Sequence, residues 1–387
     1  MSTPLKSLLT NITSPFTSRP STPSQHTGFT TAPNATSLFP IVDSAVDGED
    51  CLHDCETCTI AYPRKFKIDE DDELYGQVTG WATHMLVATG KTDWVRDVED
   101  EKGSVMEAVG KADVKPSNGT PSSTDPKQRP TTILLLPAFT LVDNVRPADV
   151  PDLIGHFINK SATTTTPLNH SHPLPPPAPD LSSAVADLTI SSAPTITPAP
   201  PPPPPPSHLF SRPCPHTYLI LLCSQRTRDA RCGQSAPLLR RELERHLRPL
   251  GLFRDLNDER PGGVGIYFIS HVGGHKYSAN MMIYRRGGGA SEPKPVVKPT
   301  VKPAVKEGTE ADAGEEGKRD KSAGMKKAAR GAEEFGQGEA TQAIWLARVR
   351  PEDCEAIVKF TVLQGKVVKP QRQLRGGWDR EKGLVSW

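Results

Sequence analysis

The chain has 387 residues, of which 40 are proline, about twice the usual share of ~5%. Its 46 basic and 45 acidic residues leave a net charge of +1, which excludes a strong overall attraction to nucleic acid or to an anionic membrane. No apolar run reaches the ~18 residues that a membrane-spanning helix needs, so we expect a soluble protein without a membrane span.

The N-terminal segment differs in composition from the rest of the chain. Residues 1–48 are rich in Ser, Thr and Pro and are predicted to form a disordered tail. Up to Asp43 the only basic residues are Lys6 and Arg19, too few for a typical mitochondrial transit peptide. A secretory apolar segment is not visible either. We therefore expect a cytoplasmic protein, with a mitochondrial location as the alternative.

Residues 49–160 are predicted to form a small N-terminal α/β domain. Strand-like apolar runs at residues 81–88 and 131–136 precede a helix expected at residues 150–158. Asp149 is placed to cap that helix.

A proline-rich linker is predicted at residues 161–212. The run from Pro200 to Pro206 favours polyproline II, which has no donors for a sheet, so we interpret the segment as a semi-rigid spacer. Such a run is also typical of segments that proline-binding domains recognise.

Residues 213–387 are predicted to form a second α/β domain. A strand at residues 217–222 runs into Cys223, and a loop at residues 224–234 is expected to lead to a helix capped by Ser235. Further strands are expected at residues 265–270 and 280–284.

The same domain is expected to carry a disordered insertion at residues 287–340, because KP repeats and mixed charge fill this stretch. A strand at residues 343–349 and a helix opened by Pro351 come after it. The order strand, helix, strand, strand, strand, helix predicts a thioredoxin-type α/β layout, in which helices flank a small mixed sheet.

Four metal-binding side chains are predicted to gather at one edge of this sheet. Cys223 ends one strand, and Cys232 comes after eight intervening residues. His271 directly follows the next strand, and His275 lies four residues further on. Ligands in open α/β sheets bind at the carboxyl ends of strands. The two glycines between the histidines favour a tight loop that turns both rings the same way.

Two thiolates and two imidazoles suit either a tetrahedral zinc ion or a 2Fe–2S cluster. Seven cysteines without a signal peptide favour a reducing compartment, where clustered cysteines are more often metal ligands than disulfides. Two ferric ions, two sulfides and two thiolates carry no net charge together with neutral imidazoles. The reduction potential should therefore lie above that of an all-cysteine cluster. The residues alone leave zinc and iron–sulfur open.

The runs Cys223-Ser-Gln-Arg-Thr-Arg-Asp-Ala-Arg-Cys232 and His271-Val-Gly-Gly-His275 resemble the fungal sucrase/ferredoxin-like family. The N-terminal runs Cys55-x-x-Cys58 with the subsequent Tyr-Pro, and Thr-Gly-Lys-Thr-Asp-Trp at residues 89–94, extend the likeness.

The resemblance implies a thioredoxin-like ferredoxin domain with one 2Fe–2S cluster per chain, in bis-histidinyl, non-Rieske coordination. By resemblance, Cys223 and Cys232 are the cysteine ligands and His271 and His275 the histidine ligands. The implied function is electron transfer or redox sensing, with an unidentified reductase and acceptor, rather than an enzyme with its own substrate. A zinc-stabilised interaction module built on the same four residues is the alternative. The linker and the insertion depart from the family pattern.

Cys51, Cys55 and Cys58 form a second group of cysteines. They lack a matching distant pair of ligands in their segment, so we interpret them as packing residues rather than a second metal site. A thiol oxidoreductase using Cys55 and Cys58 is disfavoured, because Tyr62 and Pro63 stand where a redox helix would begin.

Cys214, His216 and Trp387 are further residues whose chemistry suits binding. Cys214 and His216 lie near Cys223 in sequence but are assigned to the end of the linker. Trp387, with a free carboxylate, suits capture in a pocket and resembles the terminal aromatic that clients present to the cytosolic iron–sulfur targeting machinery. That interpretation favours the cytoplasm. No residue is proposed as a catalytic acid, base or nucleophile.

Overall fold

The structure is a computed structural model that describes residues 28–112, 117–119, 130–168, 206–287 and 338–387. Most of the predicted tail, most of the run from Pro200 to Pro206 and most of the predicted insertion lie outside these residues. The described part is mixed α/β, as the sequence predicts.

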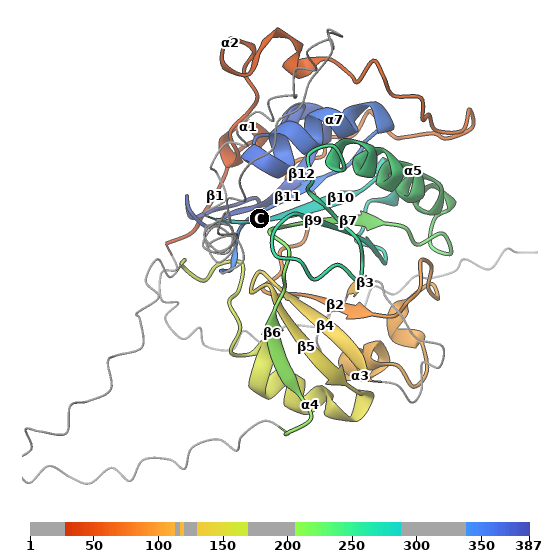
Figure 1. The fold of residues 1–387 in the computed structure, drawn as a ribbon, viewed down its shortest axis with the longest axis vertical. Coiled ribbons are helices and arrows are strands. Elements are labelled where there is room, and N and C mark those ends of the chain that lie inside the picture. Colours follow the sequence, from red (N-terminus) through yellow and green to blue (C-terminus); the bar gives the residue numbers. More distant parts are fainter. Residues whose placement is uncertain (1–27, 113–116, 120–129, 169–205, 288–337) are drawn as a thin grey trace, which may run out of the picture.

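Thirteen strands of the described part form one mixed sheet (Figure 1). Their order is β1-β13-β12-β11-β10-β7-β9-β3-β2-β4-β5-β6, and β8 pairs with β9 outside this path. The strands are β1 (Thr30–Thr31), β2 (His84–Ala88), β3 (Ser117–Gly119), β4 (Thr131–Leu136), β5 (Thr140–Val145), β6 (Phe210–Pro213), β7 (Tyr218–Cys223), β8 (Phe253–Arg254), β9 (Val264–Ile269), β10 (Met281–Arg286), β11 (Ala340–Leu346), β12 (Leu374–Asp379) and β13 (Leu384–Val385).

The helices are short apart from α5, and several are 3₁₀ or π turns. The α-helices are α1 (Ala35–Leu38), α2 (Ser44–Asp47), α3 (Val105–Lys111), α4 (Val150–Leu153), α5 (Ala230–Leu247), α7 (Cys354–Ala356) and α8 (Pro370–Gln373). The 3₁₀ turns are η1 (Glu49–Leu52), η2 (Val98–Asp100), η3 (Pro147–Asp149), η5 (His275–Tyr277) and η6 (Pro351–Asp353), and the π turns are η4 (Ile154–Ile158) and η7 (Ile357–Val362).

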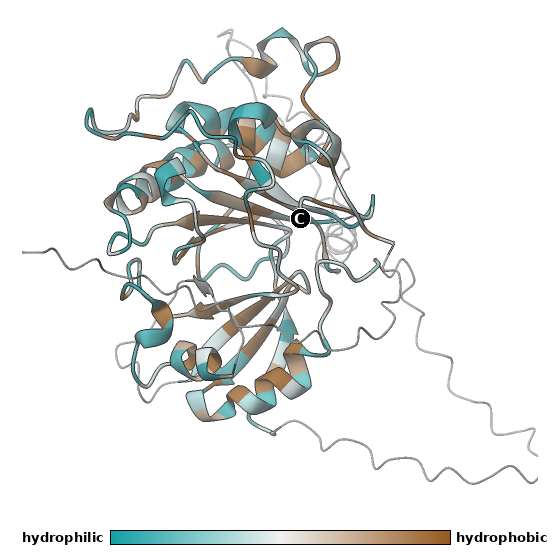
Figure 2. Ribbon diagram, turned by 180° about the vertical axis from the view of Figure 1, so that it is seen from behind, coloured by the Kyte–Doolittle hydropathy of each residue, from teal (hydrophilic) through white to brown (hydrophobic). Residues whose placement is uncertain are grey.

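Apolar side chains form three main core clusters. Figure 2 shows hydrophobic residues along the strands and a mixture of hydrophobic and hydrophilic residues on the helices. On β7, Ile220 and Leu222 face α5 and η7, whereas Leu219 and Leu221 face the opposite way, toward Leu134 of β4. This alternation is what a strand buried on both faces requires. A third cluster lies between β2, β4 and β5 and the helices α3 and α4. The molecule is therefore layered as helices, the part of the sheet around β7, the part of the sheet around β4, and helices.

The cluster of strands around β7 has a defined order. β7 and β9 are parallel, β10 is antiparallel to β7, and β11 is antiparallel to β10. The helix α5 connects β7 to the strands β8 and β9, and α7 follows β11. The carboxyl ends of β7 and β9 consequently lie side by side, with Cys223 opposite Ile269.

Two predictions about local structure are wrong. The helix α5 begins at Ala230, not after Ser235, because the Asp229 side chain caps it by accepting a hydrogen bond from the Arg231 amide. Ser235 is therefore buried within the helix, and the predicted loop of residues 224–234 ends at Asp229.

The predicted tail is ordered over its last part. Residues 30–47 form β1, α1 and α2, and Leu38 and Phe39 are buried in the core that α5 covers. The strand β1 pairs in parallel with β13, so the segment adds to the far edge of the sheet. Its short apolar stretches are too isolated to show a periodic pattern in the sequence.

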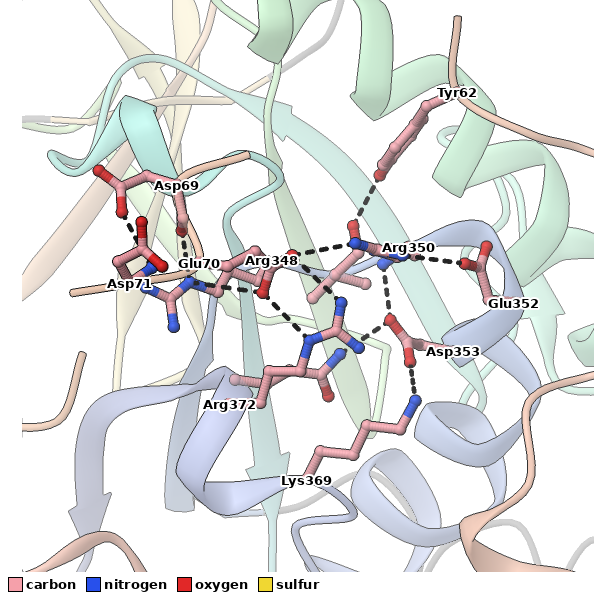
Figure 3. A network of polar contacts seen from close by, with 12 residues as sticks. Tyr62, Asp69, Glu70, Asp71, Arg348, Arg350, Glu352, Asp353, Lys369 and Arg372 are labelled. Carbon is pink, nitrogen blue, oxygen red and sulfur yellow. Dashed lines mark hydrogen bonds and ion pairs between the residues drawn. The ribbon is translucent and has the colours of Figure 1, made fainter. Parts of the chain in front are cut away.

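Residues 62–72 run along the C-terminal half of the chain rather than the N-terminal strands. Glu70 is the centre of an ion-pair network with Arg350 and Arg372, at distances of 3.0 and 3.2 Å (Figure 3). Nearby, Asp353 accepts from the Arg350 amide and pairs with Lys369. These contacts fix the segment on the outside of η6 and α8.

Both ends of the predicted linker are held by the protein. The Thr164 hydroxyl donates to the Trp81 carbonyl, and Arg380 donates to the Thr166 carbonyl. On the other side of the undescribed residues 169–205, β6 pairs with β5 and completes the N-terminal strands. The chain thus returns to the first group of strands before it enters β7.

Candidate metal centre

The two predicted cysteine ligands are in contact. Cys223 is the last residue of β7 and is 2% exposed, and Cys232 lies in the first turn of α5 and is 1% exposed. A hydrogen bond between the two thiols and burial raise the pKa of Cys223. The same hydrogen bond, together with one from Ser278, lowers the pKa of Cys232. Cys232 is thus the thiol that deprotonates first, at a helix N-terminus that favours its charge.

The two predicted histidine ligands form a second pair. The rings of His271 and His275 lie with their centroids 5.2 Å apart. Within the described part of the chain, the Nδ1 atom of each ring is buried and has no hydrogen-bond partner. A buried polar atom without a partner costs about 1–3 kcal/mol, and a metal ion is one group that could satisfy both. The imidazoles therefore fit the role of metal ligands.

His271 is neutral at physiological pH. Burial, assisted by the nearby charges of Arg228, His275 and Arg375, lowers its pKa to about 4. Metal ions bind the neutral imidazole, so His271 needs no deprotonation before binding.

Polar contacts hold the loop between the histidines. Asn280 donates to the Gly274 carbonyl at 3.0 Å, and Arg375 donates to the Gly273 carbonyl at 3.1 Å and to Asn280 Oδ1 at 3.0 Å. Arg375 is 4% exposed and lies over the Trp345 ring. Gly274 has φ of +62°, a left-handed conformation that glycine adopts without strain.

The cysteine loop is docked on the segment of residues 89–97. Ser224 donates to the Thr92 carbonyl at 2.8 Å, and the Thr227 amide and hydroxyl donate to the Asp93 carboxylate at 3.0 and 2.8 Å. Gln225 joins the two ligand loops, because its side chain donates to the Val95 carbonyl and accepts from the His271 amide. Asp93 and Gln225 lie in the two runs that carry the family resemblance, residues 89–94 and 223–232, but the sequence does not show which loops their side chains join.

The four predicted ligands lie in two pairs rather than in one closed group. A tetrahedral zinc site holds its ligand atoms within about 4 Å of one another. Across the described residues, one group of three Cys, His or acidic side chains brings ligand atoms within 4.8 Å of one another, and it consists of Cys55, His246 and Glu355. Cys223, Cys232, His271 and His275 do not meet that spacing.

One protein-family model matches most of the chain. The family model described as sucrase/ferredoxin-like matches residues 74–376 of the 387 residues. The chain belongs to the sucrase/ferredoxin-like family. The matched region of this sucrase/ferredoxin-like chain contains all four predicted ligands.

Curated relatives agree with this assignment. The sucrase/ferredoxin-like chain is 28% identical to actin patches distal protein 1 of Saccharomyces cerevisiae over 276 residues, which is 63% of this chain and 74% of that protein. It is 26% identical to altered inheritance of mitochondria protein 32 of Clavispora lusitaniae over 162 residues, 42% of this chain and 36% of that protein. No solved structure matches.

Cys214 and His216 lie at the other end of β7. His216 contacts the Asp258 carbonyl at 3.0 Å and the Tyr267 hydroxyl at 3.3 Å. Because β7 has six residues, about 20 Å separate its two ends, and neither residue can reach Cys223 as a spare ligand. Their assignment outside the metal centre agrees with the prediction.

Trp387 packs on its own chain. Its ring lies 4.8 Å from that of Trp81, centroid to centroid, and its backbone carbonyl accepts from the Thr31 hydroxyl at 2.9 Å. Capture of this residue by the iron–sulfur targeting machinery stays a prediction.

In the described part of the sucrase/ferredoxin-like chain, no helix combines the length and apolar character that crossing a bilayer demands.

Proposed function

We propose that this chain binds one 2Fe–2S cluster on Cys223, Cys232, His271 and His275 and functions in single-electron transfer or redox sensing. The observation that carries the proposal is the pair of buried, partnerless Nδ1 atoms beside a buried pair of interacting thiols, all within the described residues. Each iron of such a cluster takes two protein ligands, so two ligand pairs suit it better than one zinc ion.

The fold supports a thioredoxin-like domain around the centre. Along the chain, β7, α5, β9, β10, β11 and α7 follow one another in the order that the sequence predicts, with the short strand β8 added between α5 and β9, and this order is consistent with the thioredoxin-type layout that we propose. The proposed ligands follow the carboxyl ends of β7 and β9, where ligands of open α/β sheets bind.

The surrounding charges favour a reduced centre. A bound cluster supplies one-electron chemistry, and reduction adds a negative charge. The guanidinium of Arg375 lies near Cys223, and that of Arg228 lies near His271, so both stabilise added negative charge. The His275 side chain is 44% exposed and is the edge of the centre that an electron partner can approach.

The test is an absorption spectrum with iron and acid-labile sulfide analysis of the full chain, purified without oxygen. We expect about two irons and two sulfides per chain, lost in His271→Ala and Cys232→Ser and retained in the matched control Cys214→Ser. A chain that binds one zinc through these residues and no iron after reconstitution would replace the proposal with the zinc-stabilised interaction module. A Cys223–Cys232 disulfide in place of any metal would refute both the 2Fe–2S cluster and the zinc-stabilised module.

The cytoplasm is the proposed location. A relative carries mitochondrial inheritance in its name, so the mitochondrion is the competing location. Fractionation of cells that express the full chain decides between them. The reductase and acceptor are proposed as protein partners that dock beside His275.

A further inference from the structure

A second group of metal-binding side chains lies between α5, α7 and the segment of residues 51–58. Cys55, His246 and Glu355 bring one ligand atom each within 4.8 Å of one another. Cys55 and Cys58 are part of a Cys-x-x-Cys turn, which the Cys58 amide closes by donating to the Cys55 carbonyl at 3.3 Å. The sequence prediction of plain packing for these two cysteines rests on the lack of distant ligands. The fold supplies those ligands from two helices.

Cys51 differs from the other two cysteines. It is 3% exposed and packs in an apolar cluster with Val42, Phe360 and Val368. It therefore behaves as the packing residue that the sequence predicts, and it serves as a matched control for the other two.

The spacing of the ligand atoms suits a tetrahedral ion. With Zn–S of about 2.3 Å and Zn–N of about 2.0–2.1 Å, a sulfur and a nitrogen ligand lie about 3.5 Å apart. The distance from Cys55 Sγ to His246 Nε2 is 3.9 Å. Burial is the main cause that raises the pKa of Cys58, and a hydrogen bond with Glu242 and the charges of Glu242 and Cys55 add to it, so the Cys58 thiol lies near both of these side chains.

A guanidinium nitrogen contacts two members of the group, Cys55 and His246, and also Glu242. Arg245 Nη2 lies 3.3 Å from Cys55 Sγ, 2.9 Å from His246 Nε2 and 2.5 Å from Glu242 Oε1. Three electron-pair donors therefore converge on one cationic nitrogen. The Arg245 side chain is 43% exposed, so it can move to solvent and leave that position to another cation.

Glu242 shows that the group is incompletely satisfied. Its side chain is 1% exposed, and Oε1 contacts Arg245 and His246. The other oxygen, Oε2, is buried and has no hydrogen-bond partner in the described residues. A carboxylate buried to this degree is costly unless cations or donors surround it. A divalent ion in place of the guanidinium would bring two positive charges instead of one to this carboxylate and lower that cost.

We propose that Cys55, His246 and Glu355, joined by Cys58 once its thiol turns away from the Ile60 carbonyl, form a second metal site, which binds one divalent transition metal of the zinc type in place of the Arg245 guanidinium. Two thiolates, one imidazole and one carboxylate are a ligand set that zinc accepts. The ion ties the segment of residues 51–58 to α5 and α7, so its role is structural. The competing view is an arginine-centred ion-pair network without any metal.

The test uses the full chain equilibrated with Zn²⁺, freed of excess metal and analysed for zinc per chain. Zinc in the Cys223→Ser variant reports this site apart from the proposed cluster. We expect about one zinc in Cys223→Ser and in Cys51→Ser. Adding Cys55→Ser or His246→Ala to Cys223→Ser should weaken binding by more than about 100-fold, because outer-shell changes alone cost about 10–100-fold. Circular dichroism verifies that each variant is folded.

If a ligand variant fails to fold, the Arg245→Ala variant still distinguishes the second metal site from an ion-pair network without metal. The metal site predicts zinc affinity about tenfold tighter in Arg245→Ala, because a competing charged hydrogen-bond donor is removed. A chain that takes up no zinc with or without Arg245 overturns the proposal. Zinc binding that is unaffected by Cys55→Ser also overturns the second metal site. Zinc binding that is lost only in Cys223→Ser overturns it as well, and would show that the proposed cluster site binds zinc instead of iron.

Discussion

Gly274 offers a test of how the histidine loop is held. A Cβ at this residue would lie 2.7 Å from Arg375 Cζ, at a φ of +62°. The guanidinium cannot simply move aside, because Arg375 is 4% exposed and donates to the Gly273 carbonyl and to Asn280. Gly274→Ala should therefore disturb the loop that carries both proposed histidine ligands.

The neighbouring glycine provides the control and the magnitude. Gly273 has φ of +81°, but a Cβ there would meet nothing within 4 Å. Left-handed strain alone predicts that Gly273→Ala destabilises the fold by about 1–2 kcal/mol. Loss of one charged hydrogen bond adds about 1.5–3 kcal/mol, so Gly274→Ala should cost about 3–5 kcal/mol.

Urea unfolding of the full chain, followed by circular dichroism, measures both values. Iron content after reconstitution should fall in Gly274→Ala and stay near the wild-type level in Gly273→Ala. Equal losses of unfolding free energy in the two variants would refute the claim that Arg375 braces the loop.

Three further predictions concern residues outside the proposed centre. Burial lowers the pKa of His84 to about 4. The free energy of unfolding should therefore fall by about 3 kcal/mol as the pH falls from 6.5 to 4, because the unfolded state binds a proton at His84 that the folded state does not. Urea melts of His84→Gln over the same pH range should show a smaller fall. Burial alone would raise the pKa of Glu70, but hydrogen bonds from Arg372 and Arg350 outweigh it and lower that pKa, so the contribution of Glu70 to stability is present above pH ~4.5 and lost below the folded pKa. Because Glu70 is 36% exposed, Glu70→Gln should cost under about 1 kcal/mol at pH 7, and a larger loss in urea melts would contradict a screened network. Trp387→Ala should lower the free energy of unfolding by about 1–3 kcal/mol, because packing on Trp81 is lost; an unchanged Tm would show that this contact does not stabilise the fold.

The strands that build the centre can be predicted because they are continuous apolar runs. β7, β9 and β10 lie within one or two residues of the predicted runs, and β11 lies within three. The sequence does not predict β12, since Gly376 and Gly377 interrupt its apolar pattern. Local sequence therefore predicts the strands whose apolar runs are continuous, and it fails for β12, which is buried along its whole length but lacks such a run.

The residues that support the centre cannot be predicted in this way. Asp93 and Arg375 act through contacts with loops far along the chain, and although Asp93 lies in a run that carries the family resemblance, the sequence does not show the partner of either side chain. The predicted start of α5 is wrong because Asp229 and Ser235 are equally good caps, and only the packing of the helix selects one. The partners of Cys55 escape prediction for the same reason, since they come from helices distant in sequence.

The return of the chain to β5 after residue 205 has a consequence for modularity. The strand β6 comes after the proline-rich segment but completes the N-terminal strands, while Thr92 and Asp93 before that segment hold the cysteine loop after it. Cleavage within residues 169–205 would thus give two fragments that each lack part of their own support. We expect them to remain associated as a split protein, whereas either fragment expressed by itself would leave an unpaired strand edge or an unbraced ligand loop.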